Sequence, residues 1–303
     1  MLRRLFLSLS RNRTLRNFME TSPRAAGWTS RFVAGNTLRD GLQVNRQLAE
    51  RGILTALDHL GENVSTEAEA AAASREIVAA VDAIGEAGTR ATVAIKLTQF
   101  GLDLGDEVCR RNLRPVFERA RAIGTRVEID MESTAYTERT LAMVRAMHAE
   151  FGCVRAVLQA YLYRTETDVA ELNEMGVPIR LCKGAYQEPA DLAFPRKSDV
   201  DGNFIKLMET LLRDGTEPAI ASHDEKILLH ALAYARELKL SPERYEFQML
   251  YGIRRQWQQR LVDEGQRLRL YVPYGEAWYP YFMRRLAERP ANVIFLATNL
   301  LEN

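Results

Sequence analysis

Eight short apolar runs, each followed by an amphipathic segment, are the feature that most constrains how this chain can fold. The runs lie at Gly52–Leu57, Ala91–Thr98, Arg126–Glu132, Val154–Leu162, Ile179–Tyr186, Glu217–Asp224, Tyr245–Gly252 and Arg267–Gly275. The segments between them carry apolar residues at steps of three and four, which is typical of a helix with one buried face. Examples of such segments are Glu67–Ile84, Leu104–Ile123, Thr137–Glu150 and Glu225–Leu238. Strands that alternate with helices pair in parallel through right-handed crossovers.

Eight such units predict a closed (β/α)8 barrel of the TIM type, an α/β fold that takes about 250 residues. The chain has 303 residues, so we expect extra N-terminal helices at 1–50, the catalytic barrel at 51–303, and a C-terminal helix over the active site. An open doubly wound sheet would place a Gly-rich phosphate turn after the first strand. Asp58-His-Leu-Gly-Glu62 stands there instead, and the chain has no G-x-G-x-x-G motif. The barrel is therefore favoured.

Composition restricts the possible partners. The 41 basic and 40 acidic residues leave a net charge of +1, whereas a nucleic-acid-binding domain usually shows a basic excess. The three cysteines form no C-x-x-C pair and are odd in number, and there are four histidines. A disulfide framework, a zinc site and any other metal site are not expected. Reduced thiols fit a cytoplasmic protein.

The first nineteen residues are basic and contain no acid. No apolar segment is long enough to cross a membrane, which takes about 18 or more residues. A basic helix that caps the barrel is the simplest interpretation of this segment. An organelle transit peptide or a helix lying on a membrane surface has the same pattern.

Polar side chains gather where the eight predicted strands end, and a barrel enzyme builds its active site at those ends. The series is Asp58 and Glu62, Lys96, Asp130 with Glu132, Gln159 with Tyr161, Arg180 with Lys183, His223, Gln248 with Tyr251, and Tyr271 with Tyr274. A purely structural barrel does not need these groups, since buried charges must be desolvated. The pattern therefore predicts a catalytic or ligand-binding mouth.

Two elements add detail to this prediction. Glu128, Asp130 and Glu132 alternate along one strand and share one face, so they need cationic partners if that face points inward; Lys96, Arg180 and Lys183 are on nearby strands. In the last helix, aromatic and charged residues at positions i, i+3, i+4 and i+7 form one stripe. Its members are Tyr281, Arg284, Arg285 and Glu288. Adjacent arginines suit bidentate binding of a carboxylate, although such a stripe is also typical of a solvated helix face.

These residues, in this order, resemble the proline dehydrogenase family. The resemblance extends from Leu57 to Glu288. Its most specific motifs are Arg180-Leu-Cys-Lys-Gly-Ala-Tyr186, Phe247-Gln-Met-Leu-Tyr-Gly252, Tyr271-Val-Pro-Tyr-Gly275 and Tyr281-Phe-Met-Arg-Arg-Leu-Ala-Glu288. The likeness is to the small monofunctional bacterial members. Cys182 stands where the family more often has an aliphatic residue, and Ser222 where it usually has threonine.

The resemblance implies a non-covalent FAD over the barrel mouth. The positions that match the family's flavin contacts are Met131, Gln159, Arg180, Lys183, Gly184, Ala185, Ser222 and His223. The substrate positions are Lys96, Arg284 and Arg285 for the carboxylate, Tyr186, Leu250, Tyr271 and Tyr281 for the ring, and Glu62 and Glu288 beside the arginines. Asp130 and Arg180 take the catalytic roles.

The reaction so implied is oxidation of L-proline to 1-pyrroline-5-carboxylate by hydride transfer from C5 to flavin N5. Electrons then pass to a membrane quinone, as the first step of proline catabolism to glutamate. We expect a cytoplasmic protein with peripheral contact at the inner face of the cell membrane. Two alternatives remain open from the residues alone. One is an aldolase-like barrel with Lys96 or Lys183 as Schiff base, and the other is a barrel that binds a ligand without turnover.

Overall fold

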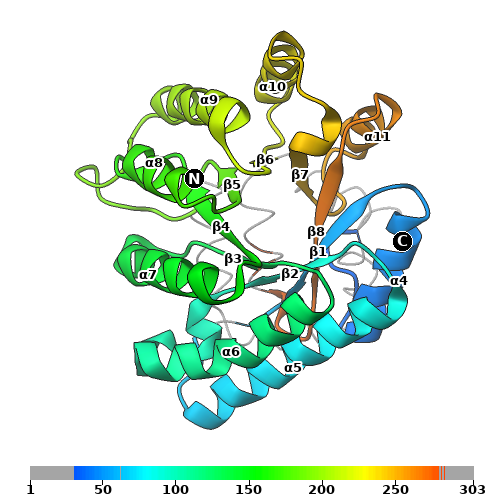
Figure 1. Cartoon of the computed structure of the whole chain (residues 1–303), viewed down its shortest axis with the longest axis vertical. Helices are drawn as coiled ribbons and strands as arrows, with labels where there is room; N and C mark the ends of the chain where they lie inside the picture. Colours follow the sequence, from blue (N-terminus) through cyan, green and yellow to red (C-terminus); the bar gives the residue numbers. More distant parts are fainter. Residues whose placement is uncertain (1–30, 62, 280, 282, 284–303) are drawn as a thin grey trace, which may run out of the picture.

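Eight parallel strands close into a barrel in the computed structural model, which describes residues 31–61, 63–279, 281 and 283. The strands are β1 Leu54–His59, β2 Thr92–Ile95, β3 Val127–Ile129, β4 Val154–Gln159, β5 Ile179–Cys182, β6 Ala219–Ala221, β7 Glu246–Leu250 and β8 Leu268–Tyr274. Each pairs with the next in chain order, and β1 closes the ring against β8, with Ala56 opposite Tyr271. The (β/α)8 barrel predicted from the eight apolar runs is confirmed (Figure 1).

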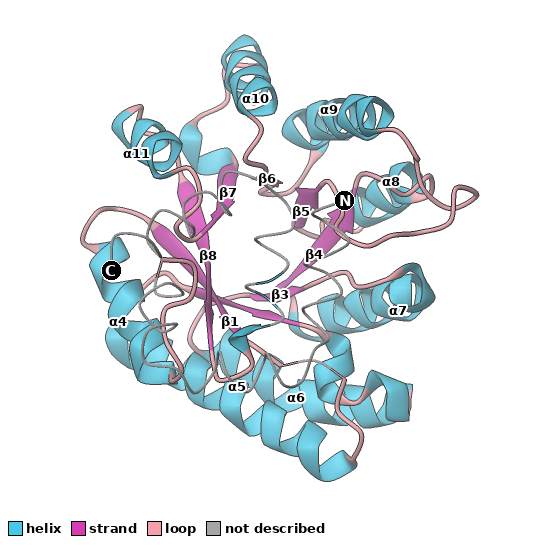
Figure 2. Cartoon of the chain, turned by 180° about the vertical axis from the view of Figure 1, so that it is seen from behind, coloured by secondary structure: helices cyan, strands magenta, loops and turns pink. Residues whose placement is uncertain are grey.

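Helices form an outer ring around the strands, as Figure 2 shows from behind. They are α4 Leu38–Ala49, α5 Glu67–Ala87, α6 Asp106–Ala122, α7 Thr134–Phe151, α8 Thr165–Glu174, α9 Lys197–Asp214, α10 Glu225–Glu237 and α11 Arg255–Asp263. Three short 3-10 turns accompany them, at Leu97–Phe100, Leu102–Leu104 and Pro242–Arg244. Helix α4 precedes β1 and belongs to the expected N-terminal helical segment. Residues 1–30 of that segment, and the part of the predicted C-terminal helix beyond Met283, lie outside the described residues.

Local signals in the sequence set where the helices begin and end. Helix α5 starts with a capping box, in which Thr66 accepts from the Glu69 backbone N–H and Glu69 accepts from the Thr66 backbone N–H. This reciprocal pair satisfies two backbone donors that have no partner within the helix. The same helix ends at Gly88, whose φ of 61° is the left-handed conformation that glycine adopts at low cost.

The apolar core lies between the strands and the helices. Val93 and Ile95 of β2 point outward and join one buried cluster with Ile77 of α5 and Leu113 of α6. Because side chains alternate along a strand, Ala94 and Lys96 point to the barrel interior instead. The interior is therefore left to a second set of side chains, and many of these are charged.

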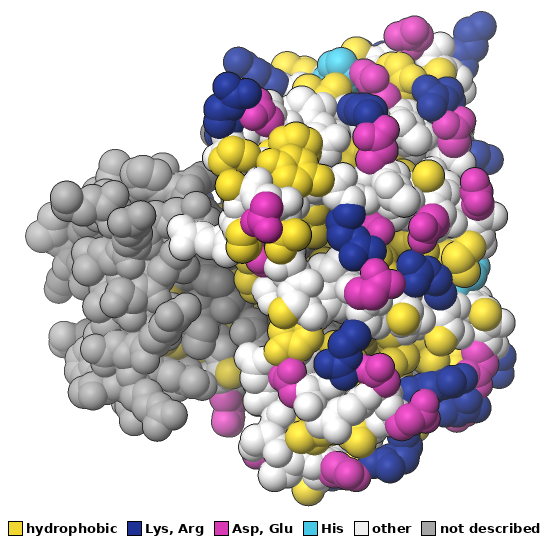
Figure 3. Space-filling view, turned by 90° about the vertical axis from the view of Figure 1, so that its left-hand side faces the viewer, with side chains coloured by type: hydrophobic (Ala, Val, Ile, Leu, Met, Phe, Trp, Pro, Cys, Tyr) yellow, Lys and Arg dark blue, Asp and Glu magenta, His cyan; other side chains and the backbone are white. Residues whose placement is uncertain are grey.

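Ion pairs join the outer helices. Arg145 of α7 pairs with Glu171 of α8, and Lys206 of α9 pairs with Glu166 of α8. On the face shown in Figure 3, basic and acidic side chains are interspersed over the described helices. Exposed pairs of this kind contribute about 0–1 kcal/mol each, so the stability of the barrel rests on its core.

Candidate active site

Three charged side chains meet at the carboxyl end of the first three strands. Asp58 is near the end of β1, while Lys96 and Asp130 directly follow β2 and β3. The Lys96 ammonium nitrogen lies 3.5 Å from Oδ1 of Asp58 and 3.5 Å from Oδ2 of Asp130. The parallel register brings these strand ends to one side of the barrel, so residues 38 and 34 positions from Lys96 become its neighbours.

Asp130 connects this group to the far side of the barrel. Arg180 of β5 donates through Nη2 to Oδ1 of Asp130, and the Tyr271 hydroxyl of β8 donates to Oδ2 at 2.8 Å. The Arg180 guanidinium carbon also lies 5.3 Å from the centre of the Tyr271 ring. Lysine, arginine and tyrosine thus surround one carboxylate, which holds all three in fixed positions across the mouth.

Beneath Arg180 lies a second, fully buried set of charges. Oε2 of Glu128 is 2.9 Å from Nη1 of Arg180, and Oε1 of Glu128 is 3.4 Å from Arg155. Glu246 binds Arg155 and also accepts from Nε of Arg269 at 2.8 Å. Barrel interiors usually hold bulky branched apolar residues, so this network of guanidiniums and carboxylates distinguishes the present barrel.

The network changes the titration of its members. Burial alone would raise the pKa of Glu128, but Arg180, Arg155 and Arg269 outweigh that effect and hold this pKa below its usual value. Arg180 is also buried, and its carboxylate neighbours Asp130 and Glu128 overcome the desolvation and raise its pKa. Asp58 shows the opposite balance, since burial raises its pKa despite the attraction of Lys96. Glu128 is therefore charged at neutral pH, whereas ionised Asp58 is costly.

The residues predicted to contact a flavin lie on neighbouring strand ends. Gln159 ends β4, donates to the Met131 carbonyl at 3.2 Å, and keeps a buried Oε1 that has no hydrogen-bond partner in the described part of the chain. After β6, the Ser222 hydroxyl accepts from the Asp224 N–H, and Nε2 of His223 accepts from the Leu250 N–H at 2.8 Å. The fixed tautomer of His223 thus carries its proton on Nδ1.

The loop after β5 carries four of the predicted positions. Lys183 follows the strand and pairs with Asp224 at 2.9 Å and with Asp201 of α9. Gly184 has a φ of 110°, and a Cβ added there would lie 2.2 Å from the Tyr161 ring. Ala185 and Tyr186 are exposed, the latter to 39%. The close approach of backbone and ring explains why glycine stands at position 184.

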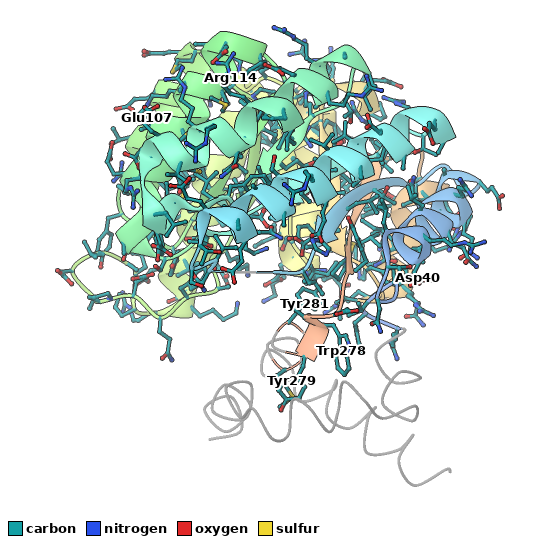
Figure 4. The ribbon with its side chains drawn as sticks, turned by 90° about the horizontal axis from the view of Figure 1, so that it is seen from below. Asp40, Glu107, Arg114, Trp278, Tyr279 and Tyr281 are labelled. Carbon is teal, nitrogen blue, oxygen red and sulfur yellow. The ribbon has the colours of Figure 1, made fainter. Side chains whose placement is uncertain are left out.

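An apolar cluster covers one side of the mouth. Phe32 and Val33 pack there with Leu60 after β1, Ile253 after β7, and the segment that follows β8. Figure 4 labels Trp278, Tyr279 and Tyr281 on that segment, at the end of the barrel. Tyr281 is 6% exposed and Leu250 packs against the cluster. The remaining predicted substrate residues, Glu62, Arg284, Arg285 and Glu288, lie outside the described residues.

Two features differ from the sequence-based expectation. Lys183 was expected near Glu128, Asp130 and Glu132, but it binds Asp201 and Asp224 because its side chain points toward α9 and α10. Glu132 accepts hydrogen bonds from the Thr98 N–H and hydroxyl, at 3.2 and 2.8 Å. Glu128, Asp130 and Glu132 therefore lie in three separate environments.

Sequence reasoning missed the buried charges of Arg155, Glu246 and Arg269. A signal exists for two of them, Glu246 and Arg269, because each stands two positions before a predicted mouth residue. Glu246 precedes Gln248 in this way, and Arg269 precedes Tyr271. Residues two apart share a strand face, so they point to the same interior as the mouth residues.

Within the described ranges, no group of three or more histidine, cysteine, aspartate and glutamate side chains is placed to hold a metal ion. No helix in those ranges is both long and apolar enough to cross a membrane.

A closed parallel barrel whose charged groups gather at the carboxyl ends of its strands defines the chain as a (β/α)8-barrel enzyme. The family model described as proline dehydrogenase matches residues 42–298. Proline dehydrogenase 1 of Bacillus subtilis is 39% identical over 302 residues and is covered completely, as is this chain. Proline dehydrogenase of Deinococcus radiodurans is 38% identical over 277 residues, covering 90% of this chain and 89% of the relative.

A solved structure has the same fold. Proline utilization A from Bdellovibrio bacteriovorus, inactivated by N-propargylglycine, superposes with a TM-score of 0.81 at 27% identity, over 86% of this chain. The chain spans about a third of that longer protein, 32% of its length. The chain belongs to the proline dehydrogenase family, and the comparisons support an oxidoreductase that oxidises proline in proline catabolism.

Proposed function

We propose that this enzyme is an FAD-dependent L-proline dehydrogenase that forms 1-pyrroline-5-carboxylate and passes electrons to a membrane quinone. The arrangement of Lys96, Arg180 and Tyr271 around Asp130 carries the proposal. It gathers a cation, a buried guanidinium and an aromatic ring at the barrel mouth of a chain that belongs to the proline dehydrogenase family.

Several described side chains fit a flavin. Gln159 presents a buried acceptor that has no partner among the described residues, and amide groups of this kind bind ring N–H donors. Gly184 lets the backbone after β5 lie directly against the Tyr161 ring, where a Cβ would clash, and this glycine is one of the proposed flavin contacts. Arg180, Lys183 and His223 complete the proposed contacts, with Met131, Ala185 and Ser222 beside them. The bound flavin would supply a hydride acceptor, its N5, for C5 of proline.

The chain's own residues would bind and orient the substrate. Lys96 is placed to attract the proline carboxylate, together with Arg284 and Arg285, which are assigned from the sequence alone. Its positive charge disfavours a protonated amine nearby, and the neutral amine is the form whose lone pair assists loss of hydride from C5. Tyr186, Leu250, Tyr271 and Tyr281 are assigned to the wall of the ring site, and Glu62 and Glu288 to the arginines.

Arg180 would stabilise negative charge that develops on the cofactor side of the site. A preorganised buried guanidinium stabilises such charge without reorganising during the reaction. Asp130 and Glu128 hold it from two directions. Asp130 is thus assigned to orientation, because it also binds the Lys96 and Tyr271 side chains.

The contacts of Lys96 bear on the aldolase-like alternative. A Schiff base requires a neutral amine, whereas the Lys96 ammonium is paired with both Asp58 and Asp130 at 3.5 Å. Lys183 is likewise paired with two carboxylates. These paired lysines therefore fit electrostatic roles in a redox enzyme better than Schiff-base formation with a carbonyl substrate.

We further propose a cytoplasmic enzyme that contacts the inner face of the cell membrane peripherally, since a quinone acceptor resides in the bilayer. The basic segment at residues 1–19 is the candidate contact, because cationic segments bind anionic lipid surfaces.

An absorption spectrum of the purified protein tests the proposal, recorded without oxygen before and after addition of L-proline. Flavin bands that bleach with L-proline would support cofactor and substrate together. Bands that persist would retain the flavin and reject proline. A colourless protein that stays inactive after FAD is added would reject the proposal, and trapping by borohydride with a carbonyl substrate would then favour the Schiff-base barrel.

A further inference from the structure

The buried charge network meets the proposed catalytic centre at one residue, Glu128. Its side chain is 0% exposed and lies on β3, two positions before Asp130. It lies within 4.0 Å of three guanidiniums, those of Arg155, Arg180 and Arg269, and Arg180 is the one that belongs to the proposed catalytic centre. Glu128 is therefore a charged group that connects the interior network to Arg180.

The two oxygens of Glu128 have different partners. Oε1 accepts from the Thr92 hydroxyl at 2.7 Å and faces Arg155. Oε2 faces Arg180 at 2.9 Å and also accepts from the Gln248 amide at 3.3 Å. One oxygen thus anchors the carboxylate in the lower network, and the other is directed at Arg180.

Arg180 is held along one edge from below. Its Nη1 contacts Glu128 and donates to Oε1 of Gln248 at 3.1 Å, while its Nη2 contacts Asp130 at the mouth. The planar guanidinium forms directional pairs with carboxylates, so these contacts define its plane. Asp130 is itself shared with Lys96 and Tyr271. Of the two described carboxylates that contact Arg180, Glu128 is consequently the one that does not also contact Lys96 or Tyr271 on the proposed substrate side.

We propose that Glu128 is a positioning residue for Arg180, which fixes the guanidinium against the lower network and offsets its positive charge toward the proposed flavin. The inference rests on the proposed function, in which Arg180 faces FAD. A carboxylate beside Arg180 reduces the attraction that its guanidinium exerts on an electron-rich cofactor. The reduction potential of the bound cofactor thus depends on a residue that touches neither cofactor nor substrate.

Glu128→Gln isolates the charge effect, because an amide oxygen can still accept the bond from Arg180. In this variant the equilibrium constant for two-electron reduction of the bound flavin should rise about tenfold. This corresponds to a rise of about 30 mV in the midpoint potential. Glu246→Gln is the matched control. It removes an equally buried carboxylate, 1% exposed, from the same network, but Glu246 contacts Arg155, Arg267, Arg269 and Gln248 rather than Arg180. In this control the equilibrium constant for two-electron reduction of the flavin should change by about threefold or less.

A charge-balanced variant guards against loss of folding. Glu128→Gln combined with Arg155→Met removes one charge of each sign, and replacing both members of a buried pair is tolerated far better than removing one. Arg180 still loses its carboxylate, so the potential should rise relative to the wild type, by less than in Glu128→Gln alone.

The experiment is a midpoint titration of the flavin in the holoenzymes, against reference dyes and without substrate. A rise in Glu128→Gln that clearly exceeds the rise in Glu246→Gln supports the inference. Equal shifts in those two variants, or an unchanged potential in the charge-balanced variant, overturn it while leaving the proposed function intact. A wild-type protein that binds no flavin overturns both.

Discussion

The Tyr271 hydroxyl donates a 2.8 Å hydrogen bond to Oδ2 of Asp130, which joins the last strand of the barrel to the end of the third. The two residues are 141 positions apart in the chain. Asp130 is thereby held at the mouth of the barrel, where the same oxygen also lies 3.5 Å from the Lys96 ammonium.

Tyr271→Phe should weaken proline binding and lower the free energy of unfolding by about 1 kcal/mol or less. Removal of the hydroxyl costs one net hydrogen bond, about 1 kcal/mol, or about fivefold in kcat/KM for proline. Tyr274→Phe is the control, since that ring packs 5.2 Å from His59, a residue on the outward face of β1. Steady-state kinetics with an artificial acceptor measures both. Equal effects in the two variants would show that the Asp130 contact is not used in catalysis.

The Asp58→Asn variant should gain stability relative to the wild type as the pH rises. Burial raises the pKa of Asp58 in the folded state, so its favourable contribution is present below the unfolded pKa of about 3.9 and is lost as the pH rises through the folded value. The asparagine variant escapes that loss. Its free energy of unfolding minus that of the wild type should therefore increase between pH 4 and 7. Each unit of pKa shift contributes about 1.4 kcal/mol. Urea titrations at several pH values measure the difference, and a pH-independent value would contradict the prediction.

Arg155→Met should destabilise the barrel strongly. The guanidinium is buried against Glu128 and Glu246, and removing one member of a buried ion pair typically costs about 3–5 kcal/mol. Arg155→Met combined with Glu246→Gln should recover part of this loss, because it does not leave the second charge uncompensated. Urea unfolding of both variants provides the test. A double variant that is no more stable than the single one would mean that packing, rather than charge balance, explains the cost.

Gly184→Ala should impair the loop after β5. The glycine has a φ of 110° and an added Cβ would overlap the Tyr161 ring at 2.2 Å. Gly265→Ala is the control, since its φ is 70° and nothing lies within 4 Å of the added Cβ. Backbone strain alone costs about 1–2 kcal/mol, so the control should lose about that much stability. Gly184→Ala should lose more and, under the proposed function, should bind FAD at least about tenfold more weakly in a flavin fluorescence titration. Equal losses would remove the ring contact as the cause.

Arg285→Met should raise the proline KM steeply while FAD remains bound. This prediction comes from the sequence, because Arg285 lies outside the described residues. A charged hydrogen bond to a carboxylate is worth about 1.5–3 kcal/mol, which corresponds to about ten- to a hundredfold in KM. Proline saturation curves and the visible spectrum of the variant measure the two quantities separately. A normal KM would reject the proposed carboxylate clamp.

Much of the fold could be predicted because its signals are local. The apolar run at Val154–Leu162 contains β4, and the helical spacing in Glu67–Ile84 matches α5, which ends three residues later at Ala87. Each of these signals depends on residues a few positions apart. Strand ends were less accurate, since β6 spans only Ala219–Ala221 of the run Glu217–Asp224. The backbone pairing between neighbouring strands ends before the predicted run ends.

The mouth residues could be proposed from the sequence because a parallel barrel brings the carboxyl ends of all its strands to one side. Lys96, Asp130 and Arg180 needed only the strand order to be placed near one another. Their actual contacts depend on side-chain direction. Lys183 illustrates this, since it turns away toward Asp201 and Asp224.

The amino-acid sequence by itself determined the alternation of strands and helices, the closed barrel and the set of polar groups at its mouth, because each follows from local periodicity and strand order. Only the tertiary structure decided which charges pair. Arg155 and Glu246 are 91 positions apart and meet only when the barrel closes. In that low-dielectric interior every charge requires a partner. Local periodicity can indicate which charges face inward, but the closed barrel decides that Glu128 pairs with Arg180.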